Sequence, residues 1–86
     1  MIVTIEMTCS ACPVQFEGTL TNGKWFYFRA RGGWSLGVGD SLEDAVNGLD
    51  FEHYEDWNGD EYSGYMSTED ALACIQKALV LYLQGL

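Results

Sequence analysis

Three consecutive segments in the first half of the chain alternate between apolar and polar residues, which favours antiparallel strands. In the first segment, Val14, Phe16 and Leu20 share one face, and a period of two is that of a strand with one buried face. The pair Asn22-Gly23 follows, and Asn-Gly is the strongest short-range signal of a two-residue type I′ turn. The sequence therefore predicts a β-hairpin at this point.

The second strand of this hairpin is expected over residues 24–31. The face predicted to line the core carries Phe26, Phe28 and Ala30. Two glycines end this strand, and the alternation resumes over 34–39, which indicates a further antiparallel strand. Residues 2–7 are rich in Val, Ile and Thr, which favour strands. We therefore expect a meander of three or four strands.

Two helices are expected in the second half of the chain. Ser41 precedes Asp44 by three residues, and Ser67 precedes Asp70 in the same way, a pattern typical of helix N-termini. The first helix should be short, and its apolar residues at helical spacing are Leu42, Ala45, Val46 and Leu49. The second should extend to about Gly85, and its main apolar stripe is Leu72, Ile75, Leu79, Tyr82 and Leu83. The second is apolar around most of its circumference, which implies packing on more than one side. Two kinds of packing are compatible with this wide apolar surface of the helix: a homodimer contact, and coverage by the acidic segment.

Together these patterns predict a single α+β domain over residues 1–86. The expected architecture is an antiparallel three- or four-stranded meander packed by the C-terminal helix over 68–84, with a short middle helix over about 41–48. Residues 50–66 are expected to form an acidic hairpin or loop, because a second Asn-Gly pair occurs there between aromatic residues. A chain of 86 residues is long enough for one small core.

The charge of the chain is distributed unevenly. Thirteen acidic residues against four Lys and Arg give a net charge of −9, and the segment 32–76 holds eleven of the acids without any Lys or Arg. Such a field repels nucleic acid and anionic membranes and attracts basic protein surfaces. The sequence has no apolar run of about 18 residues and no basic N-terminal region before an apolar stretch. We therefore expect a cytoplasmic protein without direct nucleic-acid or membrane contact.

The acidic segment is also rich in aromatic residues, unlike a disordered acidic tail. Carboxylates can bind Lys and Arg donors, and aromatic side chains can anchor an interface. The residues predicted to contact a basic protein are Asp50, Glu52, Glu55, Asp56, Trp57, Asp60, Glu61 and Tyr62.

Residues 7–12 read Met-Thr-Cys-Ser-Ala-Cys, which resembles the copper-site loop of heavy-metal-associated domains. The resemblance implies that Cys9 and Cys12 are metal ligands, because paired thiolates bind soft ions. In that family a helix follows the second cysteine, whereas here Pro13 and a predicted strand follow. For zinc, only Cys74 and His53 could complete four ligands. We therefore expect no cofactor, and a small metal-binding protein with copper or zinc on this pair is the alternative.

Cys9 and Cys12, the Pro13 that follows them, and the aromatic strand that ends Phe-Arg-Ala-Arg-Gly at 28–32 together resemble small uncharacterised bacteriophage proteins. The resemblance covers about the first forty residues and implies a phage or mobile-element origin. Small acidic proteins from that source include anti-CRISPR proteins, which offer carboxylates in place of phosphates. This similarity of class implies an inhibitor of a host defence complex in the host cytoplasm.

No complete catalytic constellation can be identified in the sequence, because the single histidine, His53, has no nearby nucleophile. We therefore predict a non-enzymatic protein with no catalytic residues. Its expected function is to occupy a basic nucleic-acid-binding groove of a host nucleic-acid-processing complex, with the acidic segment as the contact surface.

Overall fold

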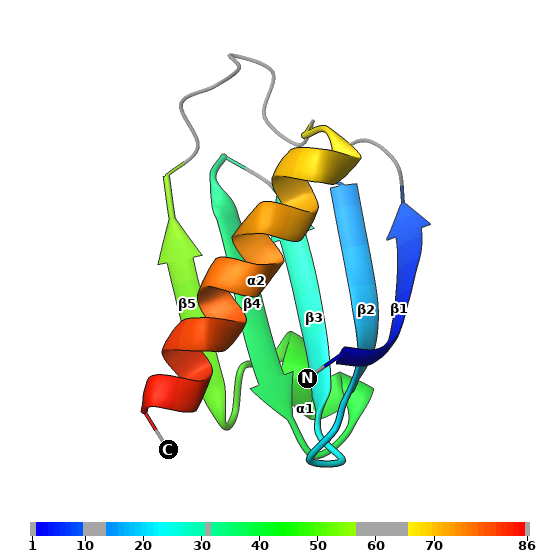
Figure 1. The fold of residues 1–86 in the computed structure, drawn as a ribbon, viewed down its shortest axis with the longest axis vertical. Helices are drawn as coiled ribbons and strands as arrows, with labels where there is room; N and C mark the ends of the chain where they lie inside the picture. The colour runs from blue at the N-terminus through cyan, green and yellow to red at the C-terminus, as the bar shows by residue number, and fades with distance from the viewer. Residues whose placement is uncertain (1, 10–13, 31, 57–65, 86) are drawn as a thin grey trace.

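The computed structural model of the chain describes residues 2–9, 14–30, 32–56 and 66–85. Within these ranges one five-stranded sheet carries a helix on each face (Figure 1). In chain order the elements are β1 (Ile2–Cys9), β2 (Val14–Leu20), β3 (Trp25–Ala30), β4 (Trp34–Gly39), α1 (Leu42–Val46), β5 (Phe51–Glu55) and α2 (Thr68–Gln84). The predicted α+β class, the antiparallel meander and the C-terminal helix are confirmed. No helix in the described ranges is long and apolar enough to cross a membrane.

The sheet has five strands, whereas three or four were predicted. Its order is β1-β2-β3-β4-β5, and every neighbouring pair is antiparallel. The additional strand is β5, which pairs with β4 from Val38 opposite Phe51 to Trp34 opposite Glu55. This strand occupies the first part of the segment 50–66, for which either a hairpin or a loop is expected. The second Asn-Gly pair of that prediction lies outside the described residues.

The hydrophobic core lies between the sheet and α2. Phe26 and Phe28 of β3 and Leu36 of β4 are fully buried, as the alternation predicts. The ring of Phe28 lies 6.2 Å from that of Phe16 and 5.8 Å from that of Trp34, measured between ring centroids. Burial of each such side chain contributes about 1.5–3 kcal/mol. The residues of α2 that complete this core are Ala71, Ile75, Ala78, Leu79 and Tyr82.

The buried face of α2 is rotated relative to the stripe that hydrophobicity alone predicts. Of the predicted stripe, Ile75, Leu79 and Tyr82 are buried, whereas Leu72 and Leu83 are 37% and 47% exposed. Ala71 and Ala78 are buried in their place. The contact face of α2 therefore combines small and large apolar residues, and Leu72 and Leu83 lie beside it toward the solvent.

The hairpin between β2 and β3 forms as predicted, but its loop is longer than a two-residue type I′ turn. The N–H of Gly23 donates to the carbonyl of Leu20 at 3.0 Å, which closes a turn with Thr21 and Asn22 at its centre. Gly23 follows with φ at +84°, a left-handed conformation that glycine adopts without strain. The N–H of Leu20 then donates to the Lys24 carbonyl at 2.8 Å.

Both helices begin where the capping pattern predicts. The Ser67 hydroxyl accepts a hydrogen bond from the Asp70 N–H at 3.1 Å, and the Ser41 hydroxyl accepts one from the Asp44 N–H at 3.2 Å. Gly85 is the C-cap of α2, as predicted. These side-chain bonds satisfy N–H groups that the first turn of a helix leaves without a partner.

Candidate protein-interaction surface

The short helix α1 lies directly on the face of the sheet opposite α2. Gly37 and Gly39 point to this face, because they alternate with the buried Leu36 and Val38. A Cβ atom at Gly37 would lie 2.1 Å from the carbonyl oxygen of Ala45. Only glycine therefore leaves room for the backbone of α1 at this distance.

The turn after α1 is held by backbone hydrogen bonds. The N–H of Leu49 donates to the Asp44 carbonyl at 3.1 Å, and the N–H of Asp50 donates to the Val38 carbonyl at 2.9 Å. Gly48, which precedes Leu49, adopts a φ of +62°, and glycine accepts this left-handed conformation most readily. The Asp50 bond joins the end of this turn to β4.

Two apolar side chains of this region face solvent although helical spacing places them with the core. Val46 is 49% exposed and Leu49 is 66% exposed, while Ala45 is fully buried. A Cβ atom at Gly48 would lie 2.8 Å from the Cβ atom of Glu52, so Glu52 of β5 lies beside this turn. We define the α1 patch as Glu43, Asp44, Val46, Leu49 and Glu52.

Most of the α1 patch is missing from the binding residues predicted from sequence, which include only Glu52. Helical spacing groups Val46 and Leu49 with Leu42 and Ala45, which hides their exposure. The sequence signal that could have found the patch is the pair Gly37 and Gly39, because two small residues on one strand face indicate that another element packs there.

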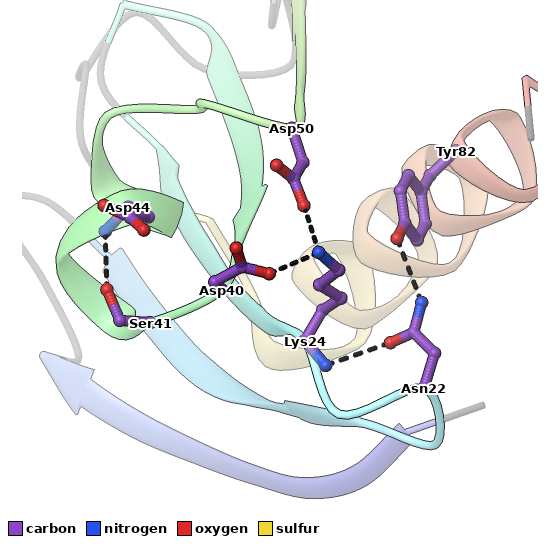
Figure 2. Close-up of polar contacts among 7 residues, drawn as sticks. All are labelled: Asn22, Lys24, Asp40, Ser41, Asp44, Asp50 and Tyr82. Carbon is purple, nitrogen blue, oxygen red and sulfur yellow. Dashed lines mark hydrogen bonds and ion pairs between the residues drawn. The ribbon is translucent and has the colours of Figure 1, made fainter.

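Beside the α1 patch, Lys24 is held between two carboxylates (Figure 2). Its Nζ atom contacts Asp40 and lies 2.7 Å from Oδ2 of Asp50. Hydrogen bonds to Asp40 and then to Asp50 raise the pKa of Lys24 well above its ordinary value. Asn22 accepts a bond from the Lys24 N–H at 3.0 Å and donates one to the Tyr82 hydroxyl at 2.9 Å, which ties this corner to α2.

We expect Lys24→Met to lower the melting temperature at neutral pH, because the Asp40 and Asp50 carboxylates would lose their shared cation. The raised pKa means that this stabilisation is complete below the ordinary pKa of 10.5 and is lost as the pH rises above it. Thermal unfolding at pH 7 measures the effect. High salt should reduce the difference from the wild type, because salt screens partly exposed charges.

Lys77→Met is the matched control, because it removes the same charge. Among the described residues Lys77 forms an ion pair with Glu55 alone, and its side chain is 58% exposed against 31% for Lys24. Exposed pairs contribute little to stability, so a smaller decrease is expected. Equal melting temperatures for Lys24→Met and the wild type would contradict a stabilising role of the ion pairs that Lys24 forms with Asp40 and Asp50.

The predicted binding residues within the described ranges lie on different faces of the sheet and at different ends of β5. Asp50 is engaged by Lys24, and it precedes β5 at the same end of the strand as the α1 patch. Glu52 points away from α2, whereas Glu55 lies on the α2 side, because residues three apart on a strand face opposite sides. Asp56 follows β5 at its other end and accepts a hydrogen bond from the Tyr54 hydroxyl at 3.2 Å. The predicted residues Trp57, Asp60, Glu61 and Tyr62 lie outside the described ranges.

Glu55 is part of a small polar cluster at the junction of β5 and α2. One of its carboxylate oxygens lies 2.8 Å from Nε2 of His53 and 2.8 Å from Nζ of Lys77. His53 and then Lys77 lower the pKa of the Glu55 carboxyl through these hydrogen bonds. The His53 ring also packs against Trp34, with 5.5 Å between ring centroids. This cluster links the last strand to α2.

The cysteines that the structure describes lie on opposite faces of the sheet. Cys9 pairs with Gln15, which faces away from α2, whereas Cys74 packs against the core from α2. Burial, followed by the charge of Asp70, raises the pKa of the Cys74 thiol, which disfavours its reactive thiolate. Among the described residues no three His, Cys, Asp or Glu side chains are arranged to hold a metal ion. Cys12 lies outside those residues, so the copper or zinc alternative stays a prediction.

Comparison with known proteins gives no significant match. Neither a protein-family model, nor a curated protein, nor a solved structure matches the chain.

Proposed function

We propose that the protein is a non-enzymatic binding protein whose α1 patch contacts a basic surface of another protein. The observation that carries this proposal is the arrangement of exposed Val46 and Leu49 among the carboxylates of the α1 patch. The ion pairs found in the described part of the chain involve Asp40, Asp50 and Glu55, and none involves an acid of the α1 patch. These acids are therefore available to cations of a partner.

The two kinds of side chain in the α1 patch have complementary roles in binding. Carboxylates attract Lys and Arg at long range, which raises the association rate and selects basic partners. Apolar side chains that leave water on contact supply most of the energy that slows dissociation. The net charge of −9 adds a field of the same sign around the whole molecule. This combination of acidic and apolar side chains supports recognition of a basic protein surface.

The proposed partner is a protein that uses Lys and Arg to bind nucleic-acid phosphates. Carboxylates can accept the same charge-assisted hydrogen bonds as phosphates, so the protein would compete with nucleic acid for the groove. The sequence resemblance to bacteriophage proteins favours a host defence complex as this partner. We therefore propose an inhibitor that resembles anti-CRISPR proteins in its class of action.

Displacement of nucleic acid tests the proposal directly. Fluorescent duplex DNA is bound to each of a panel of purified RNA-guided nuclease complexes, and its release by the full chain is followed by fluorescence polarisation. We expect the chain to displace DNA from at least one complex, with an affinity that decreases as salt increases. Retention of DNA by every complex in the panel would contradict the proposed class of partner.

The triple variant Glu43→Gln, Asp44→Asn and Glu52→Gln tests the location of the surface. We expect about tenfold weaker displacement, because three exposed charge pairs at about 0.5 kcal/mol each are lost. The salt dependence should also become weaker. Far-UV circular dichroism verifies that the fold is retained.

The matched control is Asp56→Asn with Asp60→Asn and Glu61→Gln, which changes the net charge by the same amount. These acids belong to the contact surface predicted from sequence. We expect this control to displace DNA nearly as well as the wild type. A stronger loss in the control than in the α1 patch variant would place the contact on the segment that follows β5.

A further inference from the structure

The strand β1 forms one edge of the sheet. In the described part of the chain it pairs with β2 alone, and the strand order places it last on that side. Figure 1 shows α2 crossing the sheet diagonally while β1 lies at the edge beyond it. An edge strand presents, on its open side, N–H and C=O groups that no neighbouring strand satisfies. A further strand can therefore be added to β1 through backbone hydrogen bonds.

The middle of β1 is regular, and we define it as the β1 edge, residues 4–7. Its pairing with β2 runs without interruption from Thr4 to Met7, and the register shifts on both sides of this stretch. The N–H of Thr19 donates to the Thr4 hydroxyl at 3.1 Å, which holds the start of the stretch on β2. The whole of β1 carries neither Lys nor Pro, two residues that commonly protect an edge strand from pairing. The β1 edge is therefore regular and lacks both of these protections.

Two acids lie directly opposite each other across β1 and β2. Glu6 pairs with Glu17, and both point away from α2, because Glu17 alternates with the buried Phe16. Like charges in this arrangement destabilise a sheet. Neither acid takes part in the ion pairs found among the described residues, and Arg29, which lies opposite Gln15, does not either. A cation placed beside Glu6 from the open side of β1 would offset this repulsion.

The other side of the β1 edge is apolar. Ile5 and Met7 face the α2 side, because they pair with Gly18 and Phe16, which belong to the buried face of β2. They are nevertheless 39% and 40% exposed. Side chains of an added strand alternate between the two faces of the sheet. A strand that fits this edge therefore carries apolar side chains on one face and basic side chains on the other.

We propose that the β1 edge binds an extended segment of a partner protein in which apolar and basic residues alternate. The backbone of this segment continues the sheet beyond β1. Its apolar side chains pack beside Ile5 and Met7, and a Lys or Arg lies beside Glu6 on the opposite face. In this mode of recognition the backbone hydrogen bonds supply affinity and the alternate side chains supply specificity. The proposal does not depend on the α1 patch, because Glu52 of that patch belongs to β5 at the opposite edge of the sheet.

Charge distinguishes a basic segment from a second copy of the chain as the occupant of the β1 edge. Each copy carries a net charge of −9, and β1 contains one acid, Glu6, without Lys or Arg. Pairing of two β1 strands would bring two acidic molecules together without a single ion pair between these strands. A basic segment instead gains charge-assisted contacts with Glu6. The acid on this edge thus opposes self-association and selects a basic partner.

Binding of a short peptide to the full chain tests the proposal. The probe is a fluorescent hexapeptide of alternating valine and lysine with blocked ends, and its binding is followed by fluorescence polarisation. The same peptide with glutamate in place of lysine is the control ligand. We expect only the lysine peptide to bind, with an affinity that decreases as salt increases. Hydrogen exchange followed by NMR should then show slower exchange of backbone N–H groups within residues 4–7. Absence of binding, or binding without this protection, would overturn the proposal.

Glu6→Lys tests the charge complementarity of the β1 edge. We expect about tenfold weaker peptide binding, because an attraction becomes a repulsion. The fold should be retained, since the substitution places opposite charges across β1 and β2, and the melting temperature should not decrease. The matched control is Glu52→Lys, the same change at an exposed acid of the opposite edge strand, which should leave the peptide affinity unchanged.

Two results would assign the β1 edge differently. Equal affinity of Glu6→Lys and the wild type, or a larger loss in Glu52→Lys, would overturn the location of the binding site. Protection of the N–H groups of residues 4–7 that increases with the concentration of the chain alone would identify a second copy as the occupant and overturn the assignment to a basic partner segment.

Discussion

Gly37→Ala is expected to destabilise the protein by about 3 kcal/mol or more, because overpacking of a rigid contact is among the costliest single changes. The added Cβ would lie 2.1 Å from the carbonyl oxygen of Ala45 and 3.3 Å from its carbonyl carbon. Backbone atoms of α1 cannot move aside as a flexible side chain can. Domains of this length have a total stability of roughly 4–13 kcal/mol. Urea unfolding should therefore show a large decrease in midpoint.

Gly85→Ala is the matched control for this substitution. Its nearest contacts to an added Cβ are ordinary, at 3.6 and 3.7 Å, and its φ of −84° suits any residue. We expect its stability to stay within about 0.5 kcal/mol of the wild type. A wild-type midpoint for Gly37→Ala would contradict the direct packing of α1 on β4. Displacement of α1 should also move the α1 patch and weaken DNA displacement.

The elements predicted correctly are those whose signals are local. The alternation of Phe26, Phe28 and Ala30 identifies both the strand and its buried face, and all three are buried in the structure. Ser67 and Gly85 define α2, because a cap acts within one turn of its own helix. Such signals require no knowledge of what packs on the element.

The sequence prediction left residues 50–66 as either a hairpin or a loop and did not predict that β5 pairs with β4, on which the stability of this strand depends. Its buried side is occupied by Phe51, His53 and Glu55, of which only Phe51 is strongly apolar. Propensity is weak for strands and depends on the neighbours. The face of α2 was predicted in part for a related reason, since helical spacing alone does not reveal that Ala71 and Ala78 are buried while Leu72 and Leu83 are exposed.

The acidic character of the chain can be predicted from the sequence, whereas the position of each carboxylate on the fold cannot. The excess of carboxylates can be counted from sequence, whereas their distribution over two faces depends on register. Glu52 and Glu55 are separated by the strand alternation of β5. Asp50 meets Lys24 only because the β2–β3 turn and the entry into β5 lie at the same end of the sheet. Contacts between positions so distant in sequence follow from topology.

Phe28→Ala is expected to remove about 3–5 kcal/mol of stability, because a large buried side chain is lost and a cavity remains. Phe28 has no exposed surface, and its ring lies between those of Phe16 and Trp34 in the sheet core. Against the roughly 4–13 kcal/mol typical of this chain length, the loss leaves a domain close to its unfolding threshold. Chemical unfolding monitored by tryptophan fluorescence measures the change.

Tyr27→Ala is the informative comparison, because it truncates the neighbouring aromatic residue of the same strand. Tyr27 points away from α2 and is only half-buried, so little of the core is lost and a decrease of about 1 kcal/mol is expected. Phe28→Leu, which keeps most of the volume, should cost less than about 1.5 kcal/mol. If Tyr27→Ala and Phe28→Ala destabilised the protein equally, the sheet would bury both faces to the same degree, and α2 could not be the element that closes a single core.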